Sequence, residues 1–231
     1  MPFSPTVPLI LGTPRSAWSV SPHHGSQLVG MKALRKIRDK ILSRDDYTCQ
    51  ACGWVSRQWQ EIHHRNADHT DNSEKNLVTL CPLCHQVFHL PQAAATDGGS
   101  IIWLPEMEQS ELNLICISLF VAMRHPKGKW ASSARAIEGV FQSRVAVAED
   151  FLGRAKPGFL AQALLRLRPE QFEKRNELTR ALRLLPHPSR FQSEIEYWEK
   201  ACFPDQESDA WSQLLPAELD PARGALGNEN D

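Results

Sequence analysis

The stretch that decides the fold lies at residues 61–85 and reads EIHHRNADHTDNSEKNLVTLCPLCH. It ends in the pair Cys81-x-x-Cys84, and an earlier pair, Cys49-x-x-Cys52, has the same internal spacing. Each such pair forms a tight turn that directs two thiolates at one ion, and two turns complete a tetrahedron. Thiolates favour zinc over magnesium or calcium. The spacing therefore predicts a structural zinc site that holds the segment between the turns in its fold.

A second group of polar residues lies between and after the cysteine pairs. His63 and His64 end a short strand-like run, and a polar loop follows them to residue 73. Asn76 opens the apolar run that leads into the second pair, and His85 and His89 come directly after it. This order of residues resembles the HNH, or ββα-metal, nuclease fold across residues 47–90.

The resemblance implies a role for each of these residues. His64 would be the general base that activates water, and Asn76 would orient it through its side-chain amide. His63 and His85 would bind a second divalent ion such as Mg²⁺, Mn²⁺ or Ni²⁺, with His89 as a further ligand. Phosphodiester cleavage needs a base whose pKa is near 7 and a cation beside the developing negative charge. The alternative is that the histidines are remnants of an ancestral site and have no catalytic role.

The bulk composition excludes several classes of protein. The chain has 231 residues, of which 42% are hydrophobic and 23% charged, with a formal net charge of -1. Nucleic-acid binding would therefore need a local basic patch, because no overall excess of positive charge exists. No apolar run is long enough to cross a bilayer, and the N-terminus lacks the basic segment of a signal peptide. We expect a cytoplasmic protein, either free or held at the inner-membrane face by a partner.

The remaining pattern predicts an α+β fold with the HNH-like zinc core at its centre. Residues 7–20 read as a small N-terminal hairpin, and residues 31–45 as an amphipathic helix. The basic face of that helix is either a solvated surface or a contact for phosphate or an acidic partner, and it carries Lys32, Arg35, Lys36, Arg38 and Lys40. After a short strand at 101–105, every further element is expected to be helical.

The helical pattern after residue 105 gives the expected division of the chain. Apolar residues repeat at helical spacing from 112 to 123, where Cys116 reads as core, and again from 137 to 148 with a break near Ser143. Pro157, Pro169 and Pro188 mark the first turns of three further helices. We expect an N-terminal region at 1–105, a C-terminal helical region at 106–203, and an acidic, mobile tail at 204–231.

Across nearly its whole length the chain resembles the IcmJ/DotN-type components of type IVB (Dot/Icm) secretion systems. The resemblance rests on four stretches, which are SRDDYTCQACGW at 43–54, DHTDNSEKNLVTLC at 68–81, GGSIIWLPEMEQSELNLICISLFVAM at 98–123 and LTRALRLLPHPSRFQSEIEYWEKA at 178–201. Most distinctive is the Leu-Pro-Glu stretch followed by Gln-x-Glu-Leu-Asn, which a generic HNH protein has no reason to share.

This second resemblance implies a zinc-binding adaptor of the coupling complex. Such proteins bind the C-terminal tail of the membrane-anchored coupling ATPase and other coupling subunits, and they help to recruit secreted proteins or, in conjugation, DNA. Members of the family keep the cysteines but lack the histidine pair and the histidine after the second cysteine pair. The sequence thus leaves two functions open, an adaptor without catalysis and an HNH endonuclease that cuts DNA.

Overall fold

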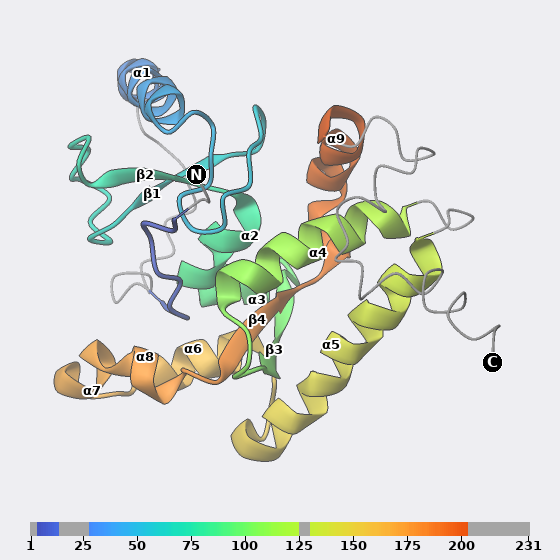
Figure 1. The fold of residues 1–231 in the computed structure, drawn as a ribbon. Helices are drawn as coiled ribbons and strands as arrows, with labels where there is room; N and C mark the ends of the chain where they lie inside the picture. Colours follow the sequence, from blue (N-terminus) through green and yellow to red (C-terminus); the bar gives the residue numbers. More distant parts are fainter. Residues whose placement is uncertain (1–3, 14–27, 125–129, 203–231) are drawn as a thin grey trace.

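A computed structural model of the chain describes residues 4–13, 28–124 and 130–202. Helices and short strands alternate along it, so the expected α+β class is correct (Figure 1). The elements are α1 (Leu28–Arg44), β1 (Glu61–His64), β2 (Leu77–Leu80), α2 (Pro82–His85), η2 (Gln86–Phe88), α3 (Leu90–Ala95), β3 (Gly99–Trp103), α4 (Gln109–Met123), α5 (Ala131–Leu152), α6 (Pro157–Leu165), α7 (Pro169–Glu173), α8 (Arg175–Leu178), β4 (Leu182–Pro186), η3 (Pro188–Phe191) and α9 (Gln192–Cys202).

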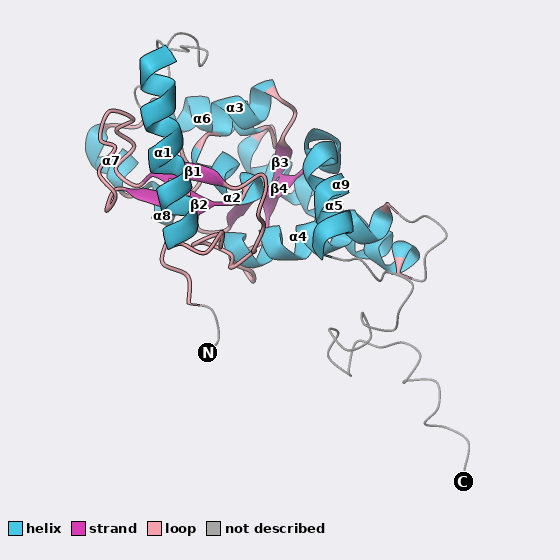
Figure 2. Cartoon of the chain, turned by 90° about the horizontal axis from the view of Figure 1, so that it is seen from above, coloured by secondary structure: helices cyan, strands magenta, loops and turns pink. Residues whose placement is uncertain are grey.

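The first sheet is a hairpin that leads directly into α2. Strands β1 and β2 pair antiparallel, with Glu61 opposite Leu80 and His64 opposite Leu77. Helix α1 lies across this hairpin (Figure 2). The end of α1 is fixed there by Asp45, whose carboxylate accepts hydrogen bonds from the Thr79 amide at 2.9 Å and from Arg44. The strand, turn and helix that carry the motif are therefore held together from one side by α1.

The second sheet corrects one expectation, because the C-terminal part is not all-helical. Strand β4 pairs antiparallel with β3, with Gly99 opposite Pro186 and Trp103 opposite Leu182. The run from Leu182 to Pro186 is entirely buried. A short run of this kind, apolar except for Arg183, fits a helix or a strand equally well, so only its partner decides. The sheet thus takes one strand from each side of the boundary expected at residue 105.

Gly99 shows how closely the two strands of this sheet approach. A Cβ atom at Gly99 would collide with the backbone carbonyl oxygen of Leu185. No side chain except hydrogen fits there, so this position requires glycine. On the outer edge of β3, the amide of Ile101 donates to the carbonyl of Ala155 at 2.9 Å, which gives this amide a partner on the side away from β4.

The N-terminal hairpin is a second correction. Residues 4–13 contain no strand, and residues 14–20 lie outside the described part of the chain. The amides of Thr6 and Val7 donate instead to the carbonyl of Gln50, and the Gly12 amide donates to Val87. Prolines at 5 and 8 have no amide hydrogen to give to a ladder. The segment therefore lies extended against the motif region rather than pairing with itself.

The helices after residue 105 form the rest of the core. The buried face of α4 carries Leu112, Cys116, Ile117 and Phe120, which confirms Cys116 as a core residue. Helix α5 runs without a break through Ser143, contrary to expectation. The three prolines begin α6, α7 and η3 as predicted. The expected tail at 204–231 lies outside the described residues.

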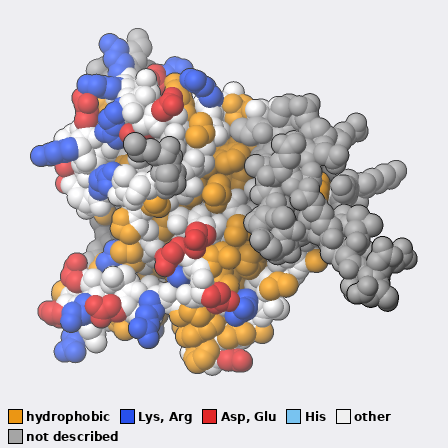
Figure 3. Space-filling model, viewed as in Figure 1, with side chains coloured by type: hydrophobic (Ala, Val, Ile, Leu, Met, Phe, Trp, Pro, Cys, Tyr) orange, Lys and Arg blue, Asp and Glu red, His pale blue; other side chains and the backbone are white. Residues whose placement is uncertain are grey.

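Charge and apolar surface lie on different parts of the molecule. Lysine and arginine side chains gather near α1, and hydrophobic side chains gather over α4 and α5 (Figure 3). Arg35, Lys36, Arg38 and Lys40 of the basic face are exposed. Two of them have partners, because Arg38 donates to the Gln60 carbonyl and Lys40 pairs with Glu74. Along the described part of the chain, no helix combines the length and the apolar character needed to cross a membrane.

Candidate metal centres

The four predicted cysteines come together from two turns. The first turn follows α1, where the amide of Gly53 donates to the carbonyl of Cys49 at 2.8 Å. Gly53 has a φ of 80°, a left-handed conformation that glycine adopts without strain. The second turn is the start of α2, where Cys81 precedes the first helical residue and Cys84 lies one turn on. The local structure therefore aims both pairs at one point.

The geometry of the cluster suits a tetrahedral metal. The four sulfur atoms lie within 4.8 Å of one another, and all four residues are buried. The sulfur atoms of Cys52 and Cys81 are 3.8 Å apart. A tetrahedron with zinc–sulfur bonds of about 2.3 Å requires sulfur atoms about 3.8 Å apart. The cysteine cluster therefore has the ligands and the size for a zinc ion.

The electrostatics of the cluster also call for a cation. Burial raises the pKa of the Cys81 and Cys84 thiols well above their ordinary value. Burial also raises the pKa of Cys49, but hydrogen bonds from the other three thiols outweigh it and hold the pKa of Cys49 well below its usual range. Four thiolates in the same space require a positive ion among them.

One residue of this centre was missed by the sequence analysis. The side-chain amide of Asn113, on α4, donates to the sulfur of Cys84 at 3.3 Å. Asn113 is fully buried on a helix face that is apolar apart from Gln109. A buried amide in such a face needs a partner, so its position in the sequence was itself a signal.

The second cluster is formed by three of the predicted histidines. The ring nitrogens of His63, His85 and His89 lie within 4.8 Å of one another. The Nε2 atoms of His85 and His89 are 3.2 Å apart. His63 comes from β1, whereas His85 ends α2 and His89 follows η2, four residues later. Three imidazoles with one free position around the ion are a ligand set for zinc, nickel or a related divalent metal.

Neighbouring side chains position these rings. The carboxylate of Glu61, opposite β2 in the hairpin, contacts the Nδ1 atom of His85, which turns its Nε2 atom toward the cluster. The ring of His63 stacks on Phe88 with ring centroids 4.2 Å apart. Burial and the nearby imidazoles lower the pKa of His63 to about 3, so its ring is neutral at physiological pH. Sequence reasoning missed Glu61 and Phe88, whose roles depend on the hairpin register.

The predicted base and its orienting residue lie beside the second cluster but do not contact as expected. The Nε2 atom of His64 is 3.2 Å from Oδ1 of Asn72. The amide of Asn76 bonds instead to the loop backbone, accepting from Asn66 N and donating to Asp71 O. Asn76 therefore fixes the loop that carries Asn72. His69 is exposed, and its ring centroid is 4.9 Å from that of His64.

Comparison with known proteins identifies the family. The chain is 36% identical over 169 residues to the type 4 apparatus protein DotN of Legionella pneumophila, which covers 71% of this chain and 78% of that protein. The chain belongs to the IcmJ/DotN family. No protein-family model matches it. The 169 residues matched to DotN are many more than the motif region at 47–90 contains, so the similarity to DotN also includes much of the helical part.

Proposed function

We propose that this chain is a zinc-stabilised adaptor subunit of the coupling complex of a type IV secretion or conjugation system. In this role it lies on the cytoplasmic side of the inner membrane, binds the C-terminal tail of the coupling ATPase and other coupling subunits, and helps to recruit substrates. The observation that carries the proposal is the similarity to a type 4 apparatus protein over a length far greater than the metal-binding region. A shared metal site alone would not extend into the helices.

In this proposal the zinc ion is structural. Cys49, Cys52, Cys81 and Cys84 would hold it, and it would supply the positive charge that keeps four buried thiolates together. Four protein ligands leave no open coordination position, so this ion activates no water. The adaptor role needs only that the ion keeps the hairpin, α2 and the first cysteine turn in place.

Helix α5 offers a docking surface for a helical tail. Ile137, Val140 and Phe151 are 44%, 58% and 67% exposed, and Val147 lies seven residues after Val140 and four before Phe151, with Arg144 between Val140 and Val147. Phe151 stacks on Trp103 with ring centroids 4.7 Å apart, which fixes its orientation. We call these four apolar α5 residues the α5 stripe. Exposed apolar side chains on one face of a helix form a surface on which an amphipathic helix can pack its own apolar face.

The adaptor proposal is tested by binding to the coupling ATPase tail encoded by the same locus. The purified chain, loaded with zinc, is expected to bind a peptide of that tail in isothermal titration calorimetry. Val140→Asp should weaken the binding at least about tenfold, because it places a negative charge within the apolar stripe. Leu178→Asp is the matched control, since Leu178 is equally exposed, at 61%, but belongs to α8.

The outcomes separate the function from the surface. Absence of binding to the tail and to every other coupling subunit would contradict the adaptor role. If Val140→Asp and Leu178→Asp bind the tail equally strongly, the adaptor role stands but α5 is not its docking surface. Weaker binding only in Val140→Asp would support both.

A second candidate function, an HNH endonuclease, is favoured by one specific observation. His63, His85 and His89 converge with their ring nitrogens within 4.8 Å, and His64 follows His63 on the same strand. Three imidazoles that converge in this way form a ligand set that suits a divalent ion. A divalent ion bound by the three rings would stabilise negative charge on a phosphate.

The other residues would then act on water and on the base. His64 would take the proton from the attacking water. If its Nε2 atom donates to Asn72, as the 3.2 Å separation allows, the lone pair lies on Nδ1, and that nitrogen is the basic one. Asn76 would act indirectly by holding the loop that carries Asn72.

Nicking of supercoiled plasmid tests the nuclease. The chain should convert plasmid to the open circular form in the presence of Mg²⁺, Mn²⁺ or Ni²⁺, and His64→Ala should reduce the rate by about 10²–10⁴-fold, the usual contribution of a general base. His187→Ala is the control, because His187 contacts Ser100 in the second sheet, away from the cluster. No cutting with any of the three metals, or cutting that His64→Ala leaves unchanged, would exclude this function.

A further inference from the structure

A line of buried hydrogen bonds joins the cysteine cluster to the edge of strand β4. It passes through two side chains of α4, Gln109 and Asn113, which are one helical turn apart and 3% and 0% exposed. Gln109 Nε2 donates to Asn113 Oδ1 at 2.9 Å, and Asn113 Nδ2 donates to Cys84 Sγ at 3.3 Å. These two residues are the Gln and the Asn of the distinctive Gln-x-Glu-Leu-Asn stretch.

At its other end the line of hydrogen bonds reaches the backbone of β4. The amide of Leu184 donates to Gln109 Oε1 at 2.7 Å, and the carbonyl of Leu184 accepts from Gln109 Nε2 at 2.9 Å. Leu184 lies opposite Ile101 in the β3–β4 ladder, so these two bonds are made on the outer edge of the sheet. The Gln109 amide thus occupies the place that a third strand would take.

The backbone determines the direction of every bond in the line. A backbone N–H only donates and a carbonyl only accepts, so Gln109 must place its oxygen at Leu184 N and its nitrogen at Leu184 O. The second hydrogen of that nitrogen then requires the oxygen of Asn113 as acceptor. The N–H groups of Asn113 are consequently turned toward Cys84, whose sulfur must accept. A metal-bound thiolate is the acceptor that makes this bond strong.

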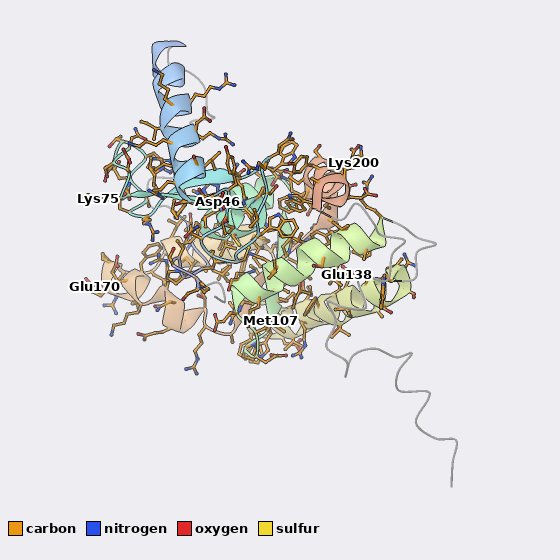
Figure 4. All side chains as sticks on the ribbon, turned by 45° about the horizontal axis from the view of Figure 1, so that its top comes forward. Asp46, Lys75, Met107, Glu138, Glu170 and Lys200 are labelled. Carbon is orange, nitrogen blue, oxygen red and sulfur yellow. The ribbon has the colours of Figure 1, made fainter. Side chains whose placement is uncertain are left out.

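The first turn of α4 is also held from the adjoining residue of β4. Met107, which lies just before α4 (Figure 4), accepts a hydrogen bond through its carbonyl oxygen from Nε of Arg183 at 2.6 Å. Because Arg183 and Leu184 are neighbours, β4 is bound both to Gln109 and to the residue two positions before it. If Gln109 moved, β4 would therefore move with it, because the start of α4 is fixed to the strand.

We infer that Asn113 is a positioning residue of the cysteine metal centre, and that the line from Cys84 through Asn113 and Gln109 makes the order of strand β4 depend on whether the metal is bound. The inference rests on the proposed loading of the four cysteines. Metal binding makes Cys84 a thiolate and fixes the Asn113 amide, which fixes Gln109 and closes the edge of β4. Loss of the metal leaves the amide of Asn113 with a poor acceptor and loosens the same edge.

The hydrogen bond can be observed in the unaltered chain after loading with ¹¹³Cd. The side-chain amide protons of Asn113 should show scalar coupling to ¹¹³Cd in nuclear magnetic resonance spectra, because the N–H···S bond connects them to the metal. A cadmium-loaded centre in which the Asn113 protons show no coupling would overturn the inference and leave the adaptor proposal intact. Failure of the chain to take up cadmium or zinc would overturn the metal centre and, with it, the inference.

Variants of α4 test whether Asn113 supports the metal centre. Asn113→Leu keeps the size of the side chain, removes the donor, and should weaken zinc binding by about 10–100-fold in competition with a chromophoric chelator. Cys116→Ala is the matched control, because it disturbs the same buried helix face without touching the line. It should bind zinc as tightly as the wild type.

Hydrogen exchange at the Leu184 amide provides the second readout. In the wild type, removing zinc with a chelator should accelerate exchange at this amide. In Asn113→Leu the exchange should already be fast with zinc bound, and the chelator should change it little. Exchange at Leu184 that is indifferent to zinc in the wild type, or zinc affinity unchanged in Asn113→Leu, would show that the centre and β4 are independent.

Discussion

Replacing Cys81 with serine is expected to abolish zinc binding and to unfold the region from residue 47 to residue 90. Cys81 is fully buried, and its carbonyl accepts the His85 amide at the start of α2. Structural zinc contributes about 10–16 kcal/mol to small zinc-binding folds, whereas a whole domain is usually stable by about 5–15 kcal/mol. Losing the ion should therefore remove most of the stability of this region. Cys49→Ser should behave in the same way.

The measurements are zinc content by mass spectrometry and thermal unfolding by circular dichroism. Cys116→Ser is the matched control, because it makes the same sulfur-to-oxygen change at a buried cysteine of α4 outside the cluster. It should keep the full zinc content and lose only the stability of a packed sulfur atom. If Cys81→Ser leaves the zinc content and the melting temperature unchanged, the four-cysteine centre is contradicted.

The second large effect is expected from Trp198→Ala. Trp198, on α9, is fully buried, and its ring meets that of Trp54 edge to face with centroids 5.9 Å apart. Trp54 lies two residues after Cys52, so this contact attaches α9 to the first cysteine turn. Truncating a buried tryptophan to alanine costs about 3–5 kcal/mol. The free energy of unfolding in denaturant, with zinc in excess, should fall by that amount.

A milder change at the same position separates packing from hydrogen bonding. The indole nitrogen of Trp198 is buried without a hydrogen-bond partner among the described residues. Trp198→Phe keeps a ring against Trp54 and removes this unpaired N–H group, so it should cost much less than Trp198→Ala. Equal losses for the two variants would mean that the ring contact contributes little.

The sequence predicted the parts of the fold that are determined by local chemistry. The two cysteine turns follow from the fixed geometry of C-x-x-C, and the starts of α6 and α7 follow from proline at the first helical turn. The amphipathic helix at 31–45 is α1, and it begins three residues earlier than expected. In each case the residues that decide the structure are within a few positions of one another.

The parts that were missed depend on residues far apart in the chain. The Leu182–Pro186 run became a strand because β3, about 80 residues earlier, offered it a ladder. Its own pattern of residues was compatible with the prediction that the region 106–203 is all-helical. The prediction of an N-terminal hairpin was wrong for a related reason. The amides of residues 6, 7 and 12 find their acceptors at Gln50 and Val87. Pairing across such distances leaves no local pattern.

The candidate sites divide in the same way. The cysteine ligands were predicted from their spacing and the histidine ligands from the resemblance to the HNH fold, and the structure brings each set together. The residues that orient them were not predicted, because Glu61, Asn72 and Asn113 reach the clusters from a hairpin register, a loop and a distant helix. Asn113 alone had a signal, as an amide within an apolar helix face.

The pairing of β3 with β4 also determines the order of events during synthesis. At about 5–20 residues per second, the ribosome takes about 4–16 s to proceed from Trp103 to Leu182. Through that interval β3 has been made but its partner has not, and a strand with open edges attracts other chains. Ala155, whose carbonyl caps Ile101 of β3, emerges before β4 does. The α5–α6 connection can therefore shield one edge of β3 before β4 is synthesised and pairs with the other edge.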